Sequence, residues 1–297
     1  MTAVQIRRAT TGDLLGVWSI LYTIEYGTSG GGPPGDEIPP YLPHEMAAGE
    51  MWVAEDAGEL VGYAVLISRG EVGFIAELFV RGERQSGRVG TALLARMLEP
   101  GLRTVCTMSS ADPRALSLYI RAGLLPQWPH FHLAGTAVMP AEPTLGVEIT
   151  EAGSAGEDIL EWDAEIGGRR RPQEHAYWRS TGGIPVWCRR GSAVIGYGYV
   201  HDMGATRGGP AIVMLGPIGA RTPGDAAACV DALVRWAHGR GGVVHIGVPG
   251  LHPSLSGLLR AGFRIQSVET FCSSSPTGFF DPRAYIPSLT LEGTALL

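Results

Sequence analysis

The order of apolar and polar segments repeats once along this 297-residue chain, and the repeat constrains the fold more than any other feature. One matched pair carries Gly-Tyr on the second arm of a hairpin, as Gly62-Tyr63 and Gly196-Tyr197, and another pair ends in Arg-Ala-Gly. The matched stretches are 4–21 with 147–163, 51–67 with 185–201, 74–98 with 211–237, and 104–124 with 243–263. The repeat predicts two domains of one fold, and a chain of this length suits two domains of about 150 residues.

Each half is predicted to run strand, helical region, hairpin, strand, helix, strand, helix and further strand. Hairpins give antiparallel pairs and crossover helices give parallel pairs, so we expect an α+β fold with mixed, mostly antiparallel twisted sheets flanked by helices. We expect domains at 1–140 and 146–297, joined by the proline- and glycine-containing segment 135–146. The segment 27–43 is too rich in glycine and proline for long regular structure; it is either an ordered substrate wall or a disordered insertion.

Composition excludes several classes of function. The formal net charge of −6 argues against nucleic-acid binding, which needs a basic face. Residues 1–145 carry 10 Arg and 15 acids (−5), whereas the remainder carries 13 Arg and 14 acids (−1). An acidic first half suits a cationic or amine-bearing substrate, although surface solubility explains it equally well. No run approaches ~18 apolar residues, so we expect a cytoplasmic protein without membrane contact.

The cysteines and histidines give no metal or disulfide pattern. The four cysteines are far apart and form no CxxC pair. His130 and His132 are expected to be strand-surface residues rather than metal ligands, and we predict no metal site. The segment 168–175, GRRRPQEH, is expected to be a solvated basic turn.

The stretch RQSGRVGTALLARML (84–98) has the order of a phosphate-binding loop. It follows a predicted strand at 73–80, contains glycines in a polar turn, and continues as a helix from about Gly87. The first amides of a helix lack intrahelical partners and its dipole is positive there, so anions bind at this end. A glycine pair before a helix is weak evidence when it stands alone.

Together with ADPRALSLYIRAGL (111–124), this stretch resembles the GNAT superfamily of acyl-CoA-dependent N-acetyltransferases. Its pyrophosphate loop reads Gln/Arg-x-x-Gly-x-Gly/Ala, and its second motif reads Asn-x-x-Ala-x-x-Leu-Tyr-x-x-x-Gly-Phe. Three residues depart from these patterns: Arg88 replaces a glycine, Asp112 the asparagine and Leu124 the phenylalanine. The resemblance covers most of residues 4–135. The matching positions are Gln85, Gly90, Ala115, Leu118, Tyr119 and Gly123.

The resemblance implies direct transfer of an acetyl group from acetyl-CoA to an amine, with Tyr119 as the acid that protonates the departing thiolate. The alternative for Tyr119 is a helix tyrosine packed in the core beside Leu116 and Ile120. The candidate base is Glu77, acting through water; its alternative role is structural or substrate-binding. Strand alternation predicts that Glu77 shares a face with Ile75 and Phe79, and burial there would raise the pKa of Glu77.

The resemblance also implies an acetyl-CoA site. Strand backbone is expected to pair with the pantetheine arm and loop amides to hold the pyrophosphate. Arg88, in ordinary right-handed helical geometry, would keep its amide, and its side chain could swing out or toward a phosphate. Asp112 and Arg114 either contact CoA or are solvated. The full set comprises Leu78, Phe79, Val80, Gln85, Ser86, Gly87, Arg88, Val89, Gly90, Thr91, Asp112, Arg114 and Ala115.

Acidic and aromatic residues lie where the family binds its acceptor. Glu25 and Tyr26, with Asp36, Glu37 and Glu45, are candidates for recognising a cationic amine, or they form a solvated acidic loop. The expected acceptor is a small-molecule primary amine, and the sequence predicts no oligomeric state. The alternatives are a non-catalytic acyl-CoA-binding sensor and a protein or peptide N-acetyltransferase.

The second half is expected to keep the fold and to lack its own cofactor site. Its counterpart of the phosphate loop, 219–230, has no Gln-x-x-Gly-x-Gly pattern, and Pro223 has no amide proton. Asp225 would cap the helix and repel phosphate. Alignment of the Arg-Ala-Gly endings places Leu258 opposite Tyr119. We therefore expect this half to be structural and to form a wall of the acceptor site; the alternative is that it binds another ligand in its emptied cleft.

Overall fold

The computed structural model describes residues 4–27, 37–85, 88–98, 102–136, 146–153, 157–205, 210–275 and 279–287. The strands are β1 (Gln5–Arg8), β2 (Glu50–Asp56), β3 (Glu59–Arg69), β4 (Val72–Val80), β5 (Thr104–Ser109), β6 (Leu125–Gly135), β7 (Val147–Glu151), β8 (Gly183–Arg190), β9 (Ala193–Ala205), β10 (Ala211–Ala220), β11 (Val243–Pro249), β12 (Arg264–Ser273) and β13 (Tyr285–Ile286). The helices are α1 (Leu14–Tyr26), α2 (Tyr41–Ala48), α3 (Val89–Met97), α4 (Pro113–Arg121), α5 (Glu157–Ile166), α6 (Pro172–Ser180), α7 (Pro223–His238) and α8 (Leu255–Arg260), with short 3-10 turns η1 (Thr11–Asp13) and η3 (Gly82–Arg84). Most of the predicted linker and of the segment 27–43 lies outside the described residues.

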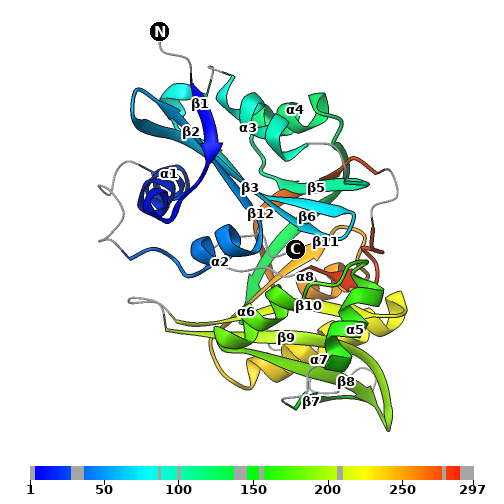
Figure 1. Cartoon of the computed structure of the whole chain (residues 1–297). Coiled ribbons are helices and arrows are strands. Elements are labelled where there is room, and N and C mark those ends of the chain that lie inside the picture. Colours follow the sequence, from blue (N-terminus) through cyan, green and yellow to red (C-terminus); the bar gives the residue numbers. More distant parts are fainter. Residues whose placement is uncertain are drawn as a thin grey trace.

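The strands form one continuous sheet (Figure 1). Its order is β1-β2-β3-β4-β5-β12-β6-β11-β10-β9-β8-β7, and β13 pairs with β10. Among the described strands, β4–β5 and β10–β11 are parallel pairs and the other pairs are antiparallel. The predicted mixed, mostly antiparallel α+β fold is confirmed.

The two halves exchange strands in the middle of this sheet. β12, from the second half, lies between β5 and β6, and β6, from the first half, lies between β12 and β11. Residues of β12 therefore line the first half, although they are far from it in sequence. The domain limits at 1–140 and 146–297 remain a prediction.

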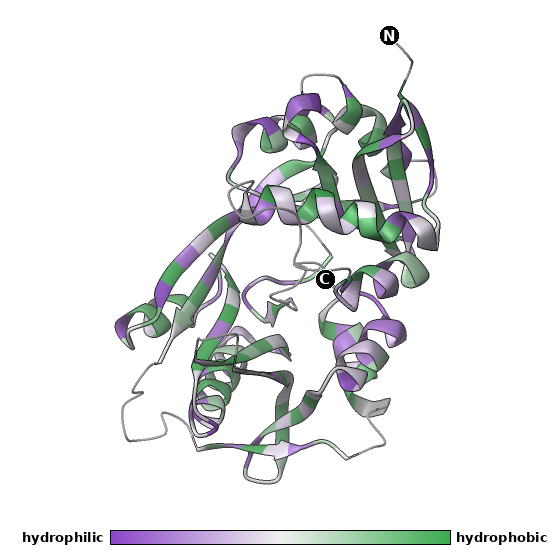
Figure 2. Ribbon diagram, turned by 90° about the vertical axis from the view of Figure 1, so that its left-hand side faces the viewer, coloured by the Kyte–Doolittle hydropathy of each residue, from purple (hydrophilic) through white to green (hydrophobic). Residues whose placement is uncertain are grey.

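Helices cover both faces of each half (Figures 1 and 2). In the first half, α3 and α4 pack on one face, while α1 and α2 pack on the face that looks toward the second half. Tyr63 of β3 and Trp178 of α6 belong to the same hydrophobic cluster, so this cluster joins the halves. Polar contacts add to it: the guanidinium of Arg69 donates two hydrogen bonds to the carboxylate of Glu174.

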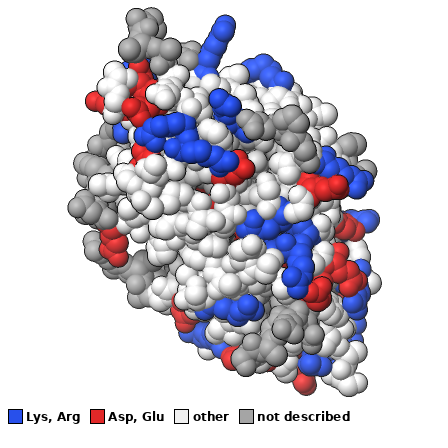
Figure 3. Space-filling view, in the orientation of Figure 1, with Lys and Arg blue, Asp and Glu red and all other residues white. Residues whose placement is uncertain are grey.

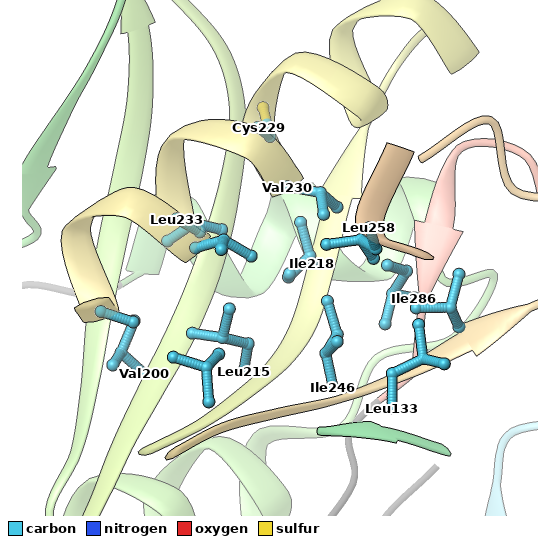
Figure 4. Packing of buried hydrophobic residues seen from close by; sticks show 14 of the residues in the cluster. Leu133, Val200, Leu215, Ile218, Cys229, Val230, Leu233, Ile246, Leu258 and Ile286 are labelled. Atoms are coloured by element: carbon cyan, nitrogen blue, oxygen red, sulfur yellow. The ribbon is translucent and has the colours of Figure 1, made fainter. Parts of the chain in front are cut away.

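The core of the second half is closed by residues from distant segments (Figure 4). Leu233 of α7 and Ile246 of β11 are buried there beside Leu133, which comes from β6 of the first half. Leu258 of α8 and Ile286 of β13 complete the cluster. The position that corresponds to Tyr119 is thus filled by an apolar side chain that packs in the core.

Charged side chains of both signs lie in separate small groups on the face shown in Figure 3, with uncharged surface between them. Among the described residues, no helix has the length and apolar character needed to cross a membrane.

Candidate active site

β4 and β5 separate in the middle of the sheet. Their parallel pairing runs from Val72–Thr104 to Ile75–Thr107 and ends there. A shift in the β3–β4 register, with Val65 opposite Glu77 and Leu66 opposite Ile75, makes Ala76 a bulge residue. Beyond this point one edge of β4 has no strand partner among the described residues. We call this gap the β4–β5 opening.

The bulge turns Glu77 to a different face from Ile75. Ile75 packs in the cluster under α3, whereas Glu77 accepts a hydrogen bond from the hydroxyl of Tyr63, which belongs to the cluster under α1 and α2. The prediction that Glu77 shares a face with Phe79 fits this arrangement, because Phe79 stacks on Tyr63. The prediction for Ile75 was wrong, because a bulge breaks the alternation of strand side chains.

Glu77 is a buried carboxyl with an unusual pKa. Only 4% of the residue is exposed, and the Tyr63 hydroxyl lies 3.4 Å from its Oε2 atom. Burial, and next the negative charge of Glu25, raise the pKa of Glu77 to about 8, while the hydrogen bond from Tyr63 opposes the rise. The group is therefore mostly protonated at neutral pH and becomes a competent base toward pH 8.

Three further carboxylates, Glu25, Glu45 and Glu269, are coupled to Glu77 or to one another, because the charge of one raises the pKa of another. Glu45 of α2 is 1% exposed, and burial and the charge of Glu77 raise its pKa well above the ordinary value. Glu25, at the exposed end of α1, has a pKa raised by exclusion of water and by the charge of Glu269. Glu269 lies on β12 and hydrogen-bonds His132 at 2.7 Å. Sequence reasoning missed Glu269, since only the exchange of strands brings it here.

Tyr119 lies on α4 beside the same opening. It is 5% exposed and packs in the cluster under α3, which agrees with a core residue as well as with an acid. Burial raises the pKa of Tyr119 to about 12, while a hydrogen bond with Thr107 lowers it. Thr107 is anchored by donating to the Ile75 carbonyl at 2.9 Å, at the last paired position of β4 and β5. The Tyr119 hydroxyl thus keeps its proton at neutral pH beside the point where the strands part.

The phosphate-loop candidate departs from the expected geometry at Arg88. Its φ of 62° and ψ of 7° are left-handed, at the N-cap of α3, so the expectation of right-handed geometry was wrong. An L-residue pays roughly 1–2 kcal/mol for this conformation, which explains the family's preference for glycine there. The helix begins at Val89 rather than near Gly87. Ser86 and Gly87 lie outside the described residues.

The left-handed residue leaves amides available at the start of α3. The first hydrogen bond of the helix in the described chain runs from the Ala92 amide to the Arg88 carbonyl, so the amides of Val89, Gly90 and Thr91 have no intrahelical acceptor. Such a turn followed by helical residues makes a concave set of donors that suits an anion. This geometry fits the pyrophosphate of acetyl-CoA.

The strand side of the expected cofactor site is also present. Leu78, Phe79 and Val80 follow the bulge, on the part of β4 that has lost its β5 partner. An exposed strand edge accepts an extended ligand as an added strand. One group is already engaged, because the side-chain amide of Gln85 donates to the Val80 carbonyl at 3.2 Å.

Asp112 and Arg114 bind each other. The Asp112 carboxylate caps α4 by accepting a hydrogen bond from the Arg114 amide at 2.8 Å, and it also receives the Arg114 guanidinium. These contacts lower the pKa of Asp112. Asp112 is therefore the N-cap residue of α4, and Ala115 follows in the first turn of the helix.

The other predicted positions have mixed outcomes. The Tyr26 side chain and Asp36 lie outside what the structure describes, and Glu37 is exposed. His130 was wrongly expected at the surface: it is 1% exposed, and burial holds its pKa well below the usual value. His132 is partly buried against Glu269. Within the described residues, no group of three or more His, Cys, Asp or Glu is placed to hold a metal ion.

In the second half, the counterpart of the β4–β5 opening is filled. Ile218 and Gly219 of β10 correspond to Leu78 and Phe79 of β4. Gly219 pairs with Tyr197 and Phe79 pairs with Tyr63, which are the tyrosines of the repeated Gly-Tyr. β13 pairs with β10 at Ile218 and Gly219. The chain's own strand therefore runs where the first half leaves an edge free. At the start of α7, Asp225 lies in the first turn and puts the expected negative charge there, while Thr222 is the N-cap residue and accepts from the amide of Asp225.

A buried network lies beside β13. Asp163 accepts hydrogen bonds from the Arg171 guanidinium at 2.7 and 2.8 Å and contacts His175 at 3.0 Å. Tyr197 and Tyr285 donate to the same carboxylate. The expectation of a solvated turn at 168–175 was wrong for most of its charged residues, which are buried. Arg171 and His175 are buried against Asp163, which supplies the opposite charge, whereas Glu174 is buried against the guanidinium of Arg69.

A depression on the second half is lined by Trp162, Trp187 and Arg221, among others. Arg221 stacks 4.0 Å over the Trp162 ring and pairs with Glu165 at 2.8 Å. These groups satisfy one another, and the depression is lined by residues of the second half alone, so we do not take it as the active site.

Comparisons with known proteins agree with this fold. Residues 47–123 match the family model of the acetyltransferase (GNAT) domain. A protein from Pyrococcus horikoshii, provisionally named an acetyltransferase, is similar over 97% of this chain and 95% of its own, with a TM-score of 0.73 and 18% identity. A GCN5-related N-acetyltransferase from Sphaerobacter thermophilus is similar over 98% of both chains, with a TM-score of 0.59 and 14% identity. A comparison with curated protein sequences finds no match.

A tandem GNAT protein from the clavulanic acid biosynthesis pathway is similar over 93% of this chain and 100% of its own, with a TM-score of 0.58 and 15% identity. The architecture of this chain is thus that of tandem GNAT-fold proteins. The chain has a tandem GNAT fold, and residues 47–123 of its first half match the GNAT acetyltransferase domain, as the sequence predicted.

Proposed function

We propose that the protein transfers the acetyl group of acetyl-CoA directly to a primary amine of a small molecule. The observation that carries the proposal is the pair of side chains at the β4–β5 opening. Glu77 is a buried carboxyl whose pKa lies near 8, and Tyr119 is a buried hydroxyl whose pKa lies near 12. One can accept a proton near neutral pH and the other can donate one, as acetyl transfer to an amine requires.

The chain's own groups supply the rest of the reaction. Bound acetyl-CoA supplies the acetyl thioester. The free edge of β4 orients the extended arm, and the amides of Val89 to Thr91 hold phosphate. Glu77 accepts the proton that the acceptor ammonium must lose, and the free amine then attacks the thioester carbonyl. As the C–N bond forms and the C–S bond breaks, the Tyr119 hydroxyl protonates the departing sulfur and regains a proton from the nitrogen that becomes the amide. The second half contributes structure, since β13 and Leu258 fill the positions that correspond to these parts.

The cofactor part of the proposal predicts a change in stability. Acetyl-CoA at 100 times its dissociation constant is expected to stabilise the protein by roughly 2.7 kcal/mol, measured as a shift in thermal unfolding. Thr91→Glu is expected to abolish the shift, because it puts a negative charge on exposed Thr91 in the first turn of α3. An acid there favours the helix itself, so loss of the shift reports on phosphate binding rather than on folding.

Thr91→Gln is the matched control and is expected to keep the shift. Titration calorimetry is expected to give one site per chain, because β13 occupies the corresponding edge of the second half. A melting curve that does not move with millimolar acetyl-CoA or CoA contradicts the cofactor assignment, and a stoichiometry of two contradicts the assignment of the second half.

Tyr119→Phe is expected to lower turnover by up to ~10²-fold with little change in CoA affinity, as loss of one general acid does. The measurement is kcat for acetyl transfer, with CoA affinity from calorimetry. The buried ring is retained in phenylalanine, so unfolding should change little. A variant with full activity would make Tyr119 a core residue only.

A further inference from the structure

Glu269 of the second half lies at the candidate active site of the first half. Thr270 of β12 pairs with Ser109, the last residue of β5, so Glu269 lies just beyond the end of β5 at the β4–β5 opening. Its negative charge raises the pKa values of Glu25, Glu77 and Tyr119. Phe271 shares a face of β12 with Glu269 and packs in one cluster with Phe74 and Ala76 of β4, so Glu269 lies on this side of the sheet.

The carboxylates around this space form two pairs. The inner pair is Glu45 and Glu77, and both residues are at most 4% exposed. The charge of Glu77 raises the pKa of Glu45. The outer pair is Glu25 and Glu269, and the charge of Glu269 raises the pKa of Glu25. The side chain of Glu269 is 17% exposed, and Glu25 lies at the surface. The inner pair is thus buried, whereas the outer pair is partly exposed to solvent.

Both pairs lack a permanent cation. Among the described residues, no arginine forms an ion pair with these four carboxylates, and His132 is the hydrogen-bonding partner of Glu269. The Oε2 atom of buried Glu45 has no hydrogen-bond partner in the described structure. Buried carboxylates without partners are costly, so a cation beside the inner pair would relieve an existing penalty, and a cation between Glu25 and Glu269 would gain charge-assisted hydrogen bonds.

We propose that the acceptor is a small amine with two cationic nitrogens, and that Glu269 of the exchanged strand binds the one that does not react. This inference rests on the proposed function. The reacting nitrogen lies beside Glu77 in the inner pair, and the second nitrogen lies between Glu269 and Glu25. His132 orients the Glu269 carboxylate through the 2.7 Å hydrogen bond. Glu269 is a specificity-determining residue that the first half alone does not possess.

The test compares short α,ω-diaminoalkanes with 1-aminoalkanes of the same chain length. Titration calorimetry of the CoA-saturated protein is expected to give at least about tenfold tighter binding for the best diamine than for its monoamine, the size of one charge-assisted hydrogen bond. Glu269→Gln is expected to remove this difference, because the amide carries no charge to bind the second nitrogen. Glu148→Gln, an exposed change on β7, is the control and is expected to keep the difference.

The outcomes separate this inference from the proposed function. Equal affinities for every diamine and its monoamine overturn the inference, as does a Glu269→Gln variant that weakens both ligands equally. If a diamine binds preferentially but mass spectrometry finds no acetylated product, the cation site stands and the proposed transfer fails. If CoA does not bind, the same titrations on the free protein still decide the cation site.

Discussion

Glu77→Gln is expected to lower kcat by roughly 10²- to 10⁴-fold at neutral pH, the effect of removing a general base. The glutamine has nearly the same shape and still accepts the hydrogen bond of Tyr63, so the acceptor should bind with little change. In the wild type, kcat/KM should rise with pH up to about 8, because the Glu77 carboxyl ionises there. The variant should lose this dependence and recover part of its rate at high pH, where the amine loses its proton unaided.

Stability measurements provide the control for this variant. Because the pKa of Glu77 is raised from 4.5 to about 8 in the folded protein, the native state holds a proton that the unfolded state releases between these pH values. The Glu77 carboxyl therefore lowers stability as pH rises through this window. Glu77→Gln should be at least as stable as the wild type at pH 8. Glu59→Gln, exposed at the start of β3, should change neither rate nor stability.

Two outcomes would assign Glu77 differently. A rise in KM with unchanged kcat would make it a residue for acceptor binding. A rate loss with the pH profile unchanged would assign the ionisation near pH 8 to another group and remove Glu77 as the base.

The features of the fold that depend on local pattern could be predicted from sequence. Apolar periodicity and turn residues located the strands, and the repeat indicated two domains of one fold. The second GNAT motif placed Tyr119 on a helix, and the predicted strand at 73–80 contained Glu77, as the structure has them. These predictions succeeded because each rests on neighbours within one or two elements.

The features that depend on distant contacts could not be predicted. Nothing local in β12 indicates that it pairs with β5, so Glu269 looked like an ordinary strand residue. The bulge at Ala76 and the left-handed Arg88 are single-residue departures from regular geometry. Arg171 and His175 lie in a stretch that reads as a surface turn, and only Asp163 explains their burial.

The repeated Gly-Tyr shows how the two halves came to differ in chemistry. Tyr63 donates to Glu77, which lacks an ion-pair partner among the described residues and keeps a raised pKa. Tyr197 donates to Asp163, where burial alone would raise the pKa but the Arg171 guanidinium holds it far below the usual range. A proton acceptor near neutral pH exists only in the first case. The same tyrosine position thus faces a proton acceptor near neutral pH in one half and a buried ion pair in the other.

Asp163→Ala is expected to lower the free energy of unfolding by about 3–5 kcal/mol, because it leaves the fully buried Arg171 guanidinium without its counter-charge. Tyr197 and Tyr285 lose the acceptor of their hydrogen bonds as well. Since β13 holds Tyr285 against this network, the C-terminal strand should loosen, which amide hydrogen exchange would detect at β10 and β13. Chemical denaturation measures the loss of stability.

Asp163→Leu combined with Arg171→Leu is the matched control and should recover much of the lost stability, because an apolar pair leaves no buried charge. A single variant that loses less than about 1 kcal/mol, the value of an ordinary surface ion pair, would show that this network does not hold the second half closed.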